Sequence, residues 1–138
     1  MGPREAAMDG VHREFFEDLA RELDGWSVAA VDAVSRKEAD LKWAGAAAAS
    51  FELLRESLPS PTLVNAYKEA LRVVLTGLLH SVMVSLDGGT QLADTVRLRV
   101  QTEDGVTLGP GLNELLFEHL HETGRLSGPG DSYRKPGG

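Results

Sequence analysis

Apolar residues recur every three or four positions along most of the chain, and this spacing predicts helices. The first such pattern covers residues 9 to 23, where charged side chains fill the opposite face. Asp9 suits the start of this helix as a capping residue, and Gly25 suits its end. The residues that follow, Trp26 to Val34, fit either a short helix or an extended stretch, and we expect a helix.

Two further helices are expected in the middle of the chain. Ser35 and Glu38 have the S-x-x-E spacing of a capping box, which predicts a helix from Arg36 to about Leu58. Residues 59 to 61 then end this helix and begin another, which runs from Thr62 to Leu86. A helix that is apolar all round must be covered all round, so we expect the apolar second half, from Ala70, to be the centre of the core.

The spacing of apolar residues changes after residue 95. Apolar and polar residues alternate from 96 to 100, which is typical of a strand with one buried face. Asp104-Gly105 suits a two-residue turn, and the alternation resumes at residues 106 to 108, so a β-hairpin is predicted. Leucines at helical spacing then predict a last short helix between residues 112 and 124.

Together these elements predict an α+β fold: a mainly helical bundle of three to four helices with one β-hairpin and a short C-terminal helix. A single globular domain is expected over residues 9 to 126, because 138 residues with 42% hydrophobic content suit one core. Residues 1 to 8 are predicted to be a flexible N-terminus. Residues 127 to 138, rich in Gly and Pro, are predicted to be a disordered tail.

Composition and charge exclude several classes of function. The chain has no cysteine, which rules out disulfides and thiolate sites and makes the cytoplasm the expected compartment. The net charge of -7 disfavours nucleic-acid binding, since phosphates are bound by Lys and Arg. The most apolar stretch, Leu71 to Leu86, is shorter than a membrane span and contains Arg72 and His80, so no membrane association is expected.

The standard catalytic and cofactor motifs are missing from the sequence, so no cofactor is predicted. One candidate pocket combines His80 with Asp87, which is seven residues away on nearly the same helix face, and with Gly88 and Gly89, whose backbone can approach a ligand. The alternative is a hydrogen-bonded histidine followed by an ordinary helix end, and we favour it.

Glu118 and His121 are candidate metal ligands. They lie three residues apart on the last predicted helix, the spacing that supplies two ligands in carboxylate-bridged di-iron bundles. A complete site needs a second such pair, and the nearest is Asp9 with His12. A surface pair that binds no metal is the simpler interpretation.

Three residues are candidates for an interaction surface. Arg97 and Arg99 project from the same side of the predicted strand, where they can meet carboxylates of a partner. Trp26 is of a type enriched at binding hot spots, as is Trp43. Solvated ion pairs are the simpler interpretation of the two arginines. Core or half-buried packing is the simpler interpretation of the tryptophans.

Two segments resemble a family of small actinobacterial proteins for which we know no activity. They are LLHSVMVSLDGGTQLADT, from Leu78 to Thr95, and LNELLFEHLHETGRL, from Leu112 to Leu126. The resemblance covers about the C-terminal half of the chain and includes no catalytic motif. It implies a bacterial, cytoplasmic protein and nothing about mechanism.

From these observations we expect a small cytoplasmic protein-binding module with an acidic surface, of the kind found in immunity proteins and antitoxins. The partner is a basic protein or a second copy of the chain, and the edge of the predicted hairpin offers one interface. The alternative is a small metal-binding protein or enzyme that uses His80, Asp87, Glu118 and His121. We favour a chain without enzymatic activity.

Overall fold

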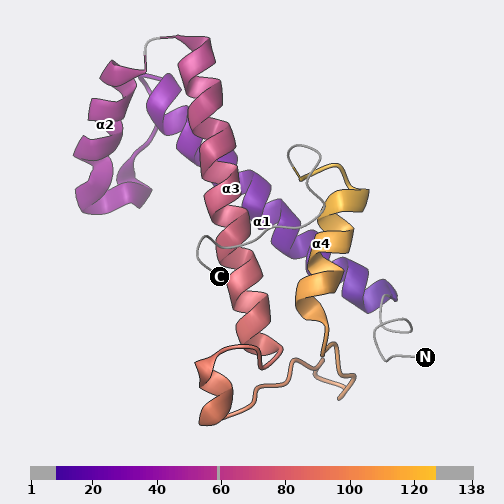
Figure 1. The fold of residues 1–138 in the computed structure, drawn as a ribbon. Coiled ribbons are helices and arrows are strands. Elements are labelled where there is room, and N and C mark those ends of the chain that lie inside the picture. The colour runs from indigo at the N-terminus through magenta and orange to yellow at the C-terminus, as the bar shows by residue number, and fades with distance from the viewer. Residues whose placement is uncertain (1–8, 59, 127–138) are drawn as a thin grey trace. The chain divides into compact units, whose positions relative to one another are not determined.

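The structure, a computed structural model, describes residues 9–58 and 60–126. This part of the chain contains four α-helices: α1 (Gly10–Ser35), α2 (Ala48–Ser57), α3 (Pro61–Leu86) and α4 (Leu112–Glu122) (Figure 1). Two short 3₁₀ segments, η2 (Lys42–Ala47) and η3 (Gln91–Asp94), precede α2 and follow α3. Since these residues include no β-strand, the fold is all-helical, and the predicted α+β class is wrong. The predicted flexible N-terminus and disordered tail lie outside the described residues.

Helix α1 is one continuous helix of 26 residues. Asp9 caps its start, because its Oδ1 accepts the backbone N–H groups of Val11 and His12 at 3.0 and 3.1 Å. The helix does not end at Gly25, so the helix expected over residues 26 to 34 is confirmed as part of α1. A glycine inside a helix costs about 1 kcal/mol, and burial of the nearby apolar Leu23 offsets this cost.

The helix predicted from Arg36 to Leu58 forms only in its second half, as α2. Ser35 does not form a capping box, because it is the last residue of α1 and its hydroxyl donates to the Val31 carbonyl at 2.6 Å. Before α2, Gly45 has a φ of 55°, a left-handed conformation that interrupts the helical path.

The chain divides into two compact units, and the boundaries between them fall inside α1 and α3. Unit 1 comprises residues 1–21 and 75–138, and unit 2 comprises residues 22–74. The buried hydrophobic residues described in unit 1 are Phe16, Ala20, Met83, Leu108, Leu112, Leu115, Leu116 and Leu120. Those in unit 2 are Leu23, Ala30, Ala33 and Val34, all of them on α1.

The predicted β-hairpin is reduced to a turn with a single bridge. The turn at Asp104-Gly105 is present, and Gly105 has a φ of 88°. Antiparallel pairing is limited to an isolated bridge between Gln101 and Thr107. Two strands need a covered apolar face to be stable, and here part of that face is open to solvent, although Leu108 is buried. Its exposed side chains are Val96, Leu98 and Val106, with exposed fractions of 46, 44 and 47%.

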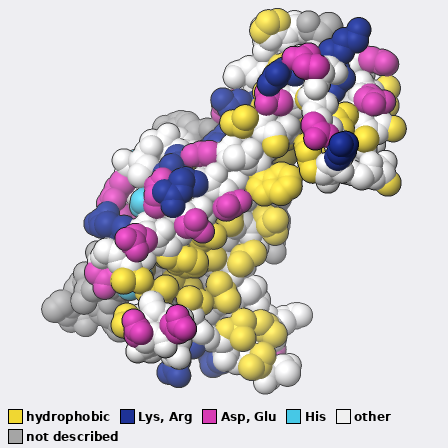
Figure 2. Space-filling model, turned by 180° about the vertical axis from the view of Figure 1, so that it is seen from behind, with side chains coloured by type: hydrophobic (Ala, Val, Ile, Leu, Met, Phe, Trp, Pro, Cys, Tyr) yellow, Lys and Arg dark blue, Asp and Glu magenta, His cyan; other side chains and the backbone are white. Residues whose placement is uncertain are grey.

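Helix α3 forms as predicted, but the expectation that residues 70 to 86 are wrapped on all sides is wrong. Val74 and Leu78 are 64 and 62% exposed, and apolar side chains remain visible on the surface (Figure 2). The segment Pro61–Asp94, which contains α3, is long and apolar enough to cross a membrane by length and composition alone. Core helices of soluble proteins meet the same criterion, so this finding assigns no compartment.

Asp87 connects the end of α3 to the start of α4. Its Oδ1 accepts the N–H groups of Gly111 and Leu112 at 3.1 and 3.0 Å, and its Oδ2 accepts that of Asn113 at 3.0 Å. The first N–H groups of a helix have no acceptor within the helix, and its N-terminus carries partial positive charge. One carboxylate therefore satisfies three donors and fixes where α4 begins.

Replacing Asp87 should destabilise unit 1. We expect Asp87→Ala to lower the free energy of unfolding by about 1 to 2 kcal/mol, because three part-buried donors lose their acceptor. Asp87→Asn, which keeps one acceptor oxygen, should cost less. Urea unfolding followed by circular dichroism measures both, and Asp94→Asn, at an exposed position, is the control. An unchanged urea midpoint for Asp87→Ala would refute this role.

Candidate functional site

The four residues of the predicted pocket mainly organise the end of α3. Both carboxylate oxygens of Asp87 accept N–H groups of α4. Gly88 has a φ of 81°, and the N–H of Gly89 donates to the Val84 carbonyl at 2.9 Å, so these residues terminate the helix. His80 is half-buried, and its ring packs edge-on against Phe117 of α4, with 5.3 Å between ring centroids. These contacts explain Asp87 to Gly89 as helix termination, and a ligand pocket stays a prediction.

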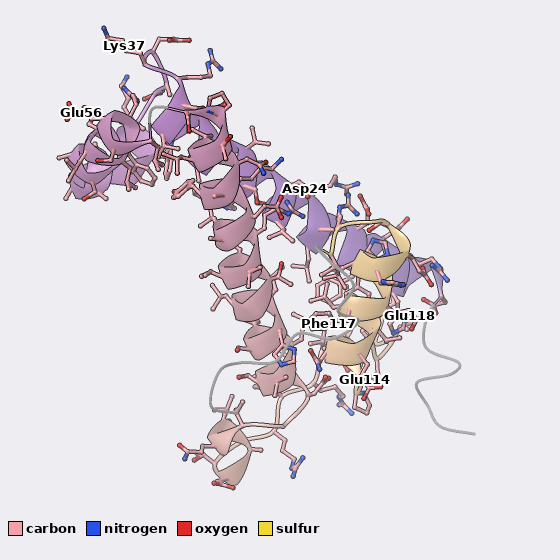
Figure 3. The ribbon with its side chains drawn as sticks, turned by 45° about the horizontal axis from the view of Figure 1, so that its top comes forward. Asp24, Lys37, Glu56, Glu114, Phe117 and Glu118 are labelled. Carbon is pink, nitrogen blue, oxygen red and sulfur yellow. The ribbon has the colours of Figure 1, made fainter. Side chains whose placement is uncertain are left out.

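The predicted metal ligands Glu118 and His121 are exposed on α4. Glu118 and Phe117 point to different sides of this helix (Figure 3). Across residues 9–58 and 60–126, no group of three or more His, Asp or Glu side chains is placed to hold a metal ion. The observed geometry therefore gives a metal site no support.

His12, the residue considered as a second metal ligand, is buried and serves the fold. Its Nδ1 lies 2.9 Å from Asp9 Oδ1, and its Nε2 lies 2.8 Å from the Leu108 carbonyl oxygen. The ring therefore links the start of α1 to the backbone at Leu108. The hydrogen bond from His12 lowers the pKa of Asp9 below its usual value.

Arg97 and Arg99 are exposed in the segment that follows η3. The Arg97 guanidinium lies against Gly88, where an added Cβ atom would come within 3.0 Å of Nη1. The predicted strand is not formed, so the argument that both side chains project from one side of it no longer holds. An interaction surface at these two residues stays a prediction.

Trp26 belongs to an exposed aromatic cluster in unit 2. It is 53% exposed, and its ring packs edge-on against Trp43, with 5.6 Å between centroids. Trp43 is 44% exposed and also contacts Phe51 of α2 at 5.2 Å. We call Trp26, Trp43 and Phe51 the aromatic surface. Neither tryptophan is a core residue, since each is about half exposed and packs against other aromatic rings.

A cleft of about 270 Å³ lies beside Trp43, and we call it the acidic cleft. Its lining residues are Ala29, Asp32, Arg36, Glu38, Ala39, Asp40 and Trp43. Arg36 pairs with Asp32 at 3.7 Å and with Glu38 at 3.2 Å. The pKa of Glu38 is lowered by hydrogen bonds from its own backbone N–H and from Arg36. Since one guanidinium faces three carboxylates, the cleft keeps an excess of negative charge.

In unit 1, Glu17 of α1 holds the end of α4. Its Oε1 accepts from Arg125 Nη1 at 2.7 Å and from His119 Nε2 at 2.8 Å, and its Oε2 accepts from Arg125 Nη2 at 2.9 Å. These bonds, first from Arg125 and then from His119, lower the pKa of Glu17 to about 2. Sequence reasoning missed this network because the partners are more than 100 residues away from Glu17.

Comparisons with models of protein families, with curated proteins and with solved structures found no match to this chain. The resemblance of residues 78–95 and 112–126 to small actinobacterial proteins therefore stays a prediction. We therefore infer function from the surfaces of the chain itself. The aromatic surface and the acidic cleft together combine exposed tryptophans with unbalanced charge.

The Glu17 network should make the stability of unit 1 depend on pH. The pKa of Glu17 is about 2 in the folded chain, below the ordinary value of 4.5. A lowered folded pKa gives stability that is complete above pH 4.5 and is lost as the pH falls toward 2. The destabilisation by Glu17→Gln should therefore be largest near neutral pH and shrink over this range. Urea unfolding at several pH values measures it.

Glu14→Gln is the matched control, because Glu14 is exposed on the same helix. It should change the pH dependence little. If the difference in unfolding free energy between the native chain and Glu17→Gln is constant from pH 7 to pH 2, the network does not stabilise the fold as described.

Proposed function

We propose that the chain is a protein-binding module that uses the aromatic surface and the acidic cleft to bind a basic, partly apolar segment of a partner protein. The observation that carries this proposal is the pair of exposed, edge-packed tryptophans beside a cleft with excess negative charge. Tryptophan is enriched at binding hot spots because its large rigid ring buries much apolar area at a low entropic cost. Both tryptophans of the chain belong to this surface.

Charge supports a basic partner. A Lys or Arg side chain over a tryptophan ring gains about 0.5 to 2 kcal/mol from the cation–π interaction, depending on how far the contact is desolvated. The carboxylates of Asp32, Glu38 and Asp40 attract the same cation, and the net charge of -7 accelerates the approach of basic proteins. We infer that the chain is an immunity protein or antitoxin that masks a basic toxin surface in the cytoplasm.

The alternative, a metal-binding protein or an enzyme, has no comparable support. Asp87 is hydrogen-bonded to the start of α4, and Glu118 and His121 are exposed on that helix. The His80 ring packs against Phe117. We therefore propose binding and no catalytic step.

The two tryptophans allow binding to be followed directly. The probe is a peptide of Lys and Leu that forms an amphipathic helix with one basic and one apolar face. Binding of this peptide should shift tryptophan emission to shorter wavelength, because the peptide covers the tryptophan rings. We expect Trp26→Ala to weaken binding by about tenfold or more, the cost typical of a hot-spot residue. Val74→Ala, which changes a 64% exposed residue of unit 2, is the control and should leave the affinity unchanged.

Charge variants test the acidic cleft separately. The double variant Asp32→Asn, Glu38→Gln should weaken binding of the Lys/Leu peptide and reduce its dependence on salt. Glu56→Gln, on an exposed residue of α2 that does not line the cleft (Figure 3), is the matched control. Equally tight binding of a Glu/Leu peptide with the same pattern, or full affinity in Trp26→Ala, would refute the proposed function.

A further inference from the structure

Unit 2 has a second concave surface that shares no residue with the acidic cleft. It has a volume of about 520 Å³, and we call it the basic groove. Residues near the end of α1, the end of α2 and the start of α3 line it. They are Val31, Val34, Ser35, Arg55, Leu58, Ser60, Pro61, Val64, Asn65 and Lys68.

The floor of the basic groove is aliphatic. Val34 is 1% exposed, and Val31, Leu58 and Val64 are half-buried. The groove has no aromatic lining residue, and its volume lies within the range typical of sites for small ligands. Such a surface suits a flexible alkyl chain, which gains affinity with each methylene removed from water.

Every charged residue that lines the basic groove is a cation. The guanidinium of Arg55 donates to the carbonyl of Ala33 at 3.0 and 3.2 Å and to that of Lys37 at 3.1 Å. The Ala33 carbonyl belongs to the last turn of α1, whose partial negative charge offsets part of the charge of Arg55. Lys68 is exposed and makes no ion pair within residues 9–58 and 60–126. The groove is therefore positive in a chain whose net charge is -7.

The start of α3 adds to this potential. Ser60 caps the helix, since the N–H of Leu63 donates to its Oγ at 3.2 Å and the N–H of Val64 donates to its carbonyl at 3.1 Å. The N-terminus of a helix carries partial positive charge, which favours an anion nearby. An aliphatic floor beside two cations and a helix start is complementary to a molecule with an alkyl chain and one negative group.

We propose that the basic groove binds a medium-chain fatty acid. Its carboxylate contacts the Lys68 ammonium group, and its alkyl chain packs on the half-buried side chains of Val31, Leu58 and Val64. This inference does not depend on the protein-binding function, because the two surfaces have different residues and opposite charge. In a series from hexanoate to decanoate, each added methylene should tighten binding by about two- to fourfold until the groove is filled.

Titration of the ¹⁵N-labelled full chain with octanoate tests the proposal. Backbone amide shifts should change at Val31, Val64 and Lys68, and 1-octanol, which has the same chain length without charge, should bind more weakly. Lys68→Glu should weaken octanoate binding by about three- to tenfold, because an exposed attraction becomes a repulsion. Lys42→Glu makes the same charge change outside the groove and should have no effect.

A second variant tests the apolar floor. Val64→Trp places a large ring in the groove and should abolish binding of both octanoate and octanol. Circular dichroism serves as the control that the variant is folded. Equal affinity for octanoate and octanol, or full affinity in Lys68→Glu, would overturn the proposal. Tighter binding of a short peptide that ends in Val-Leu with a free carboxylate would also overturn a fatty acid as the ligand.

Discussion

Hydrogen bonds from charged side chains to α1 hold the rest of the fold in place. In unit 1, Arg125 and His119 donate to Glu17 from the end of α4. In unit 2, Arg72 donates to Asp24 at 3.1 Å, and Arg55 donates to the carbonyls near the end of α1. The buried hydrophobic residues of unit 2 are few and small. In unit 2, directed bonds to charged groups therefore help to select one arrangement.

Because few apolar side chains are buried in unit 2, its candidate binding surfaces are exposed to solvent. Charged side chains complete the helix ends: Asp87 satisfies the positive start of α4, and Arg55 satisfies the negative end of α1. Apolar side chains that a larger core would cover stay exposed, including Trp26 and Trp43. Two of the concave surfaces of unit 2, the acidic cleft and the basic groove, are lined by opposite charges and suit a basic protein segment and an aliphatic anion.

Helices could be predicted from the sequence because their apolar spacing is a local property, and α3 and α4 lie where that spacing placed them. The prediction that the first helix ends at Gly25 was wrong, because burial of the nearby Leu23 outweighs the low helix propensity of glycine. The prediction of a hairpin failed because the alternation of apolar and polar residues shows which face of a strand is apolar but not whether anything covers that face. Trp26 could be singled out by residue type, whereas the cap by Asp87 joins residues 24 to 26 positions apart and left no local signal.

Helix α1 is one uninterrupted helix that contributes residues to both units. Hydrogen–deuterium exchange of the backbone amides from Leu23 to Val28 tests this continuity most directly, because this stretch includes Gly25. In a continuous helix each of these N–H groups donates to the carbonyl four residues earlier, so all of them should exchange slowly. Exchange of the amides from Gly25 to Val28 at the rate of an unstructured peptide would contradict the claim.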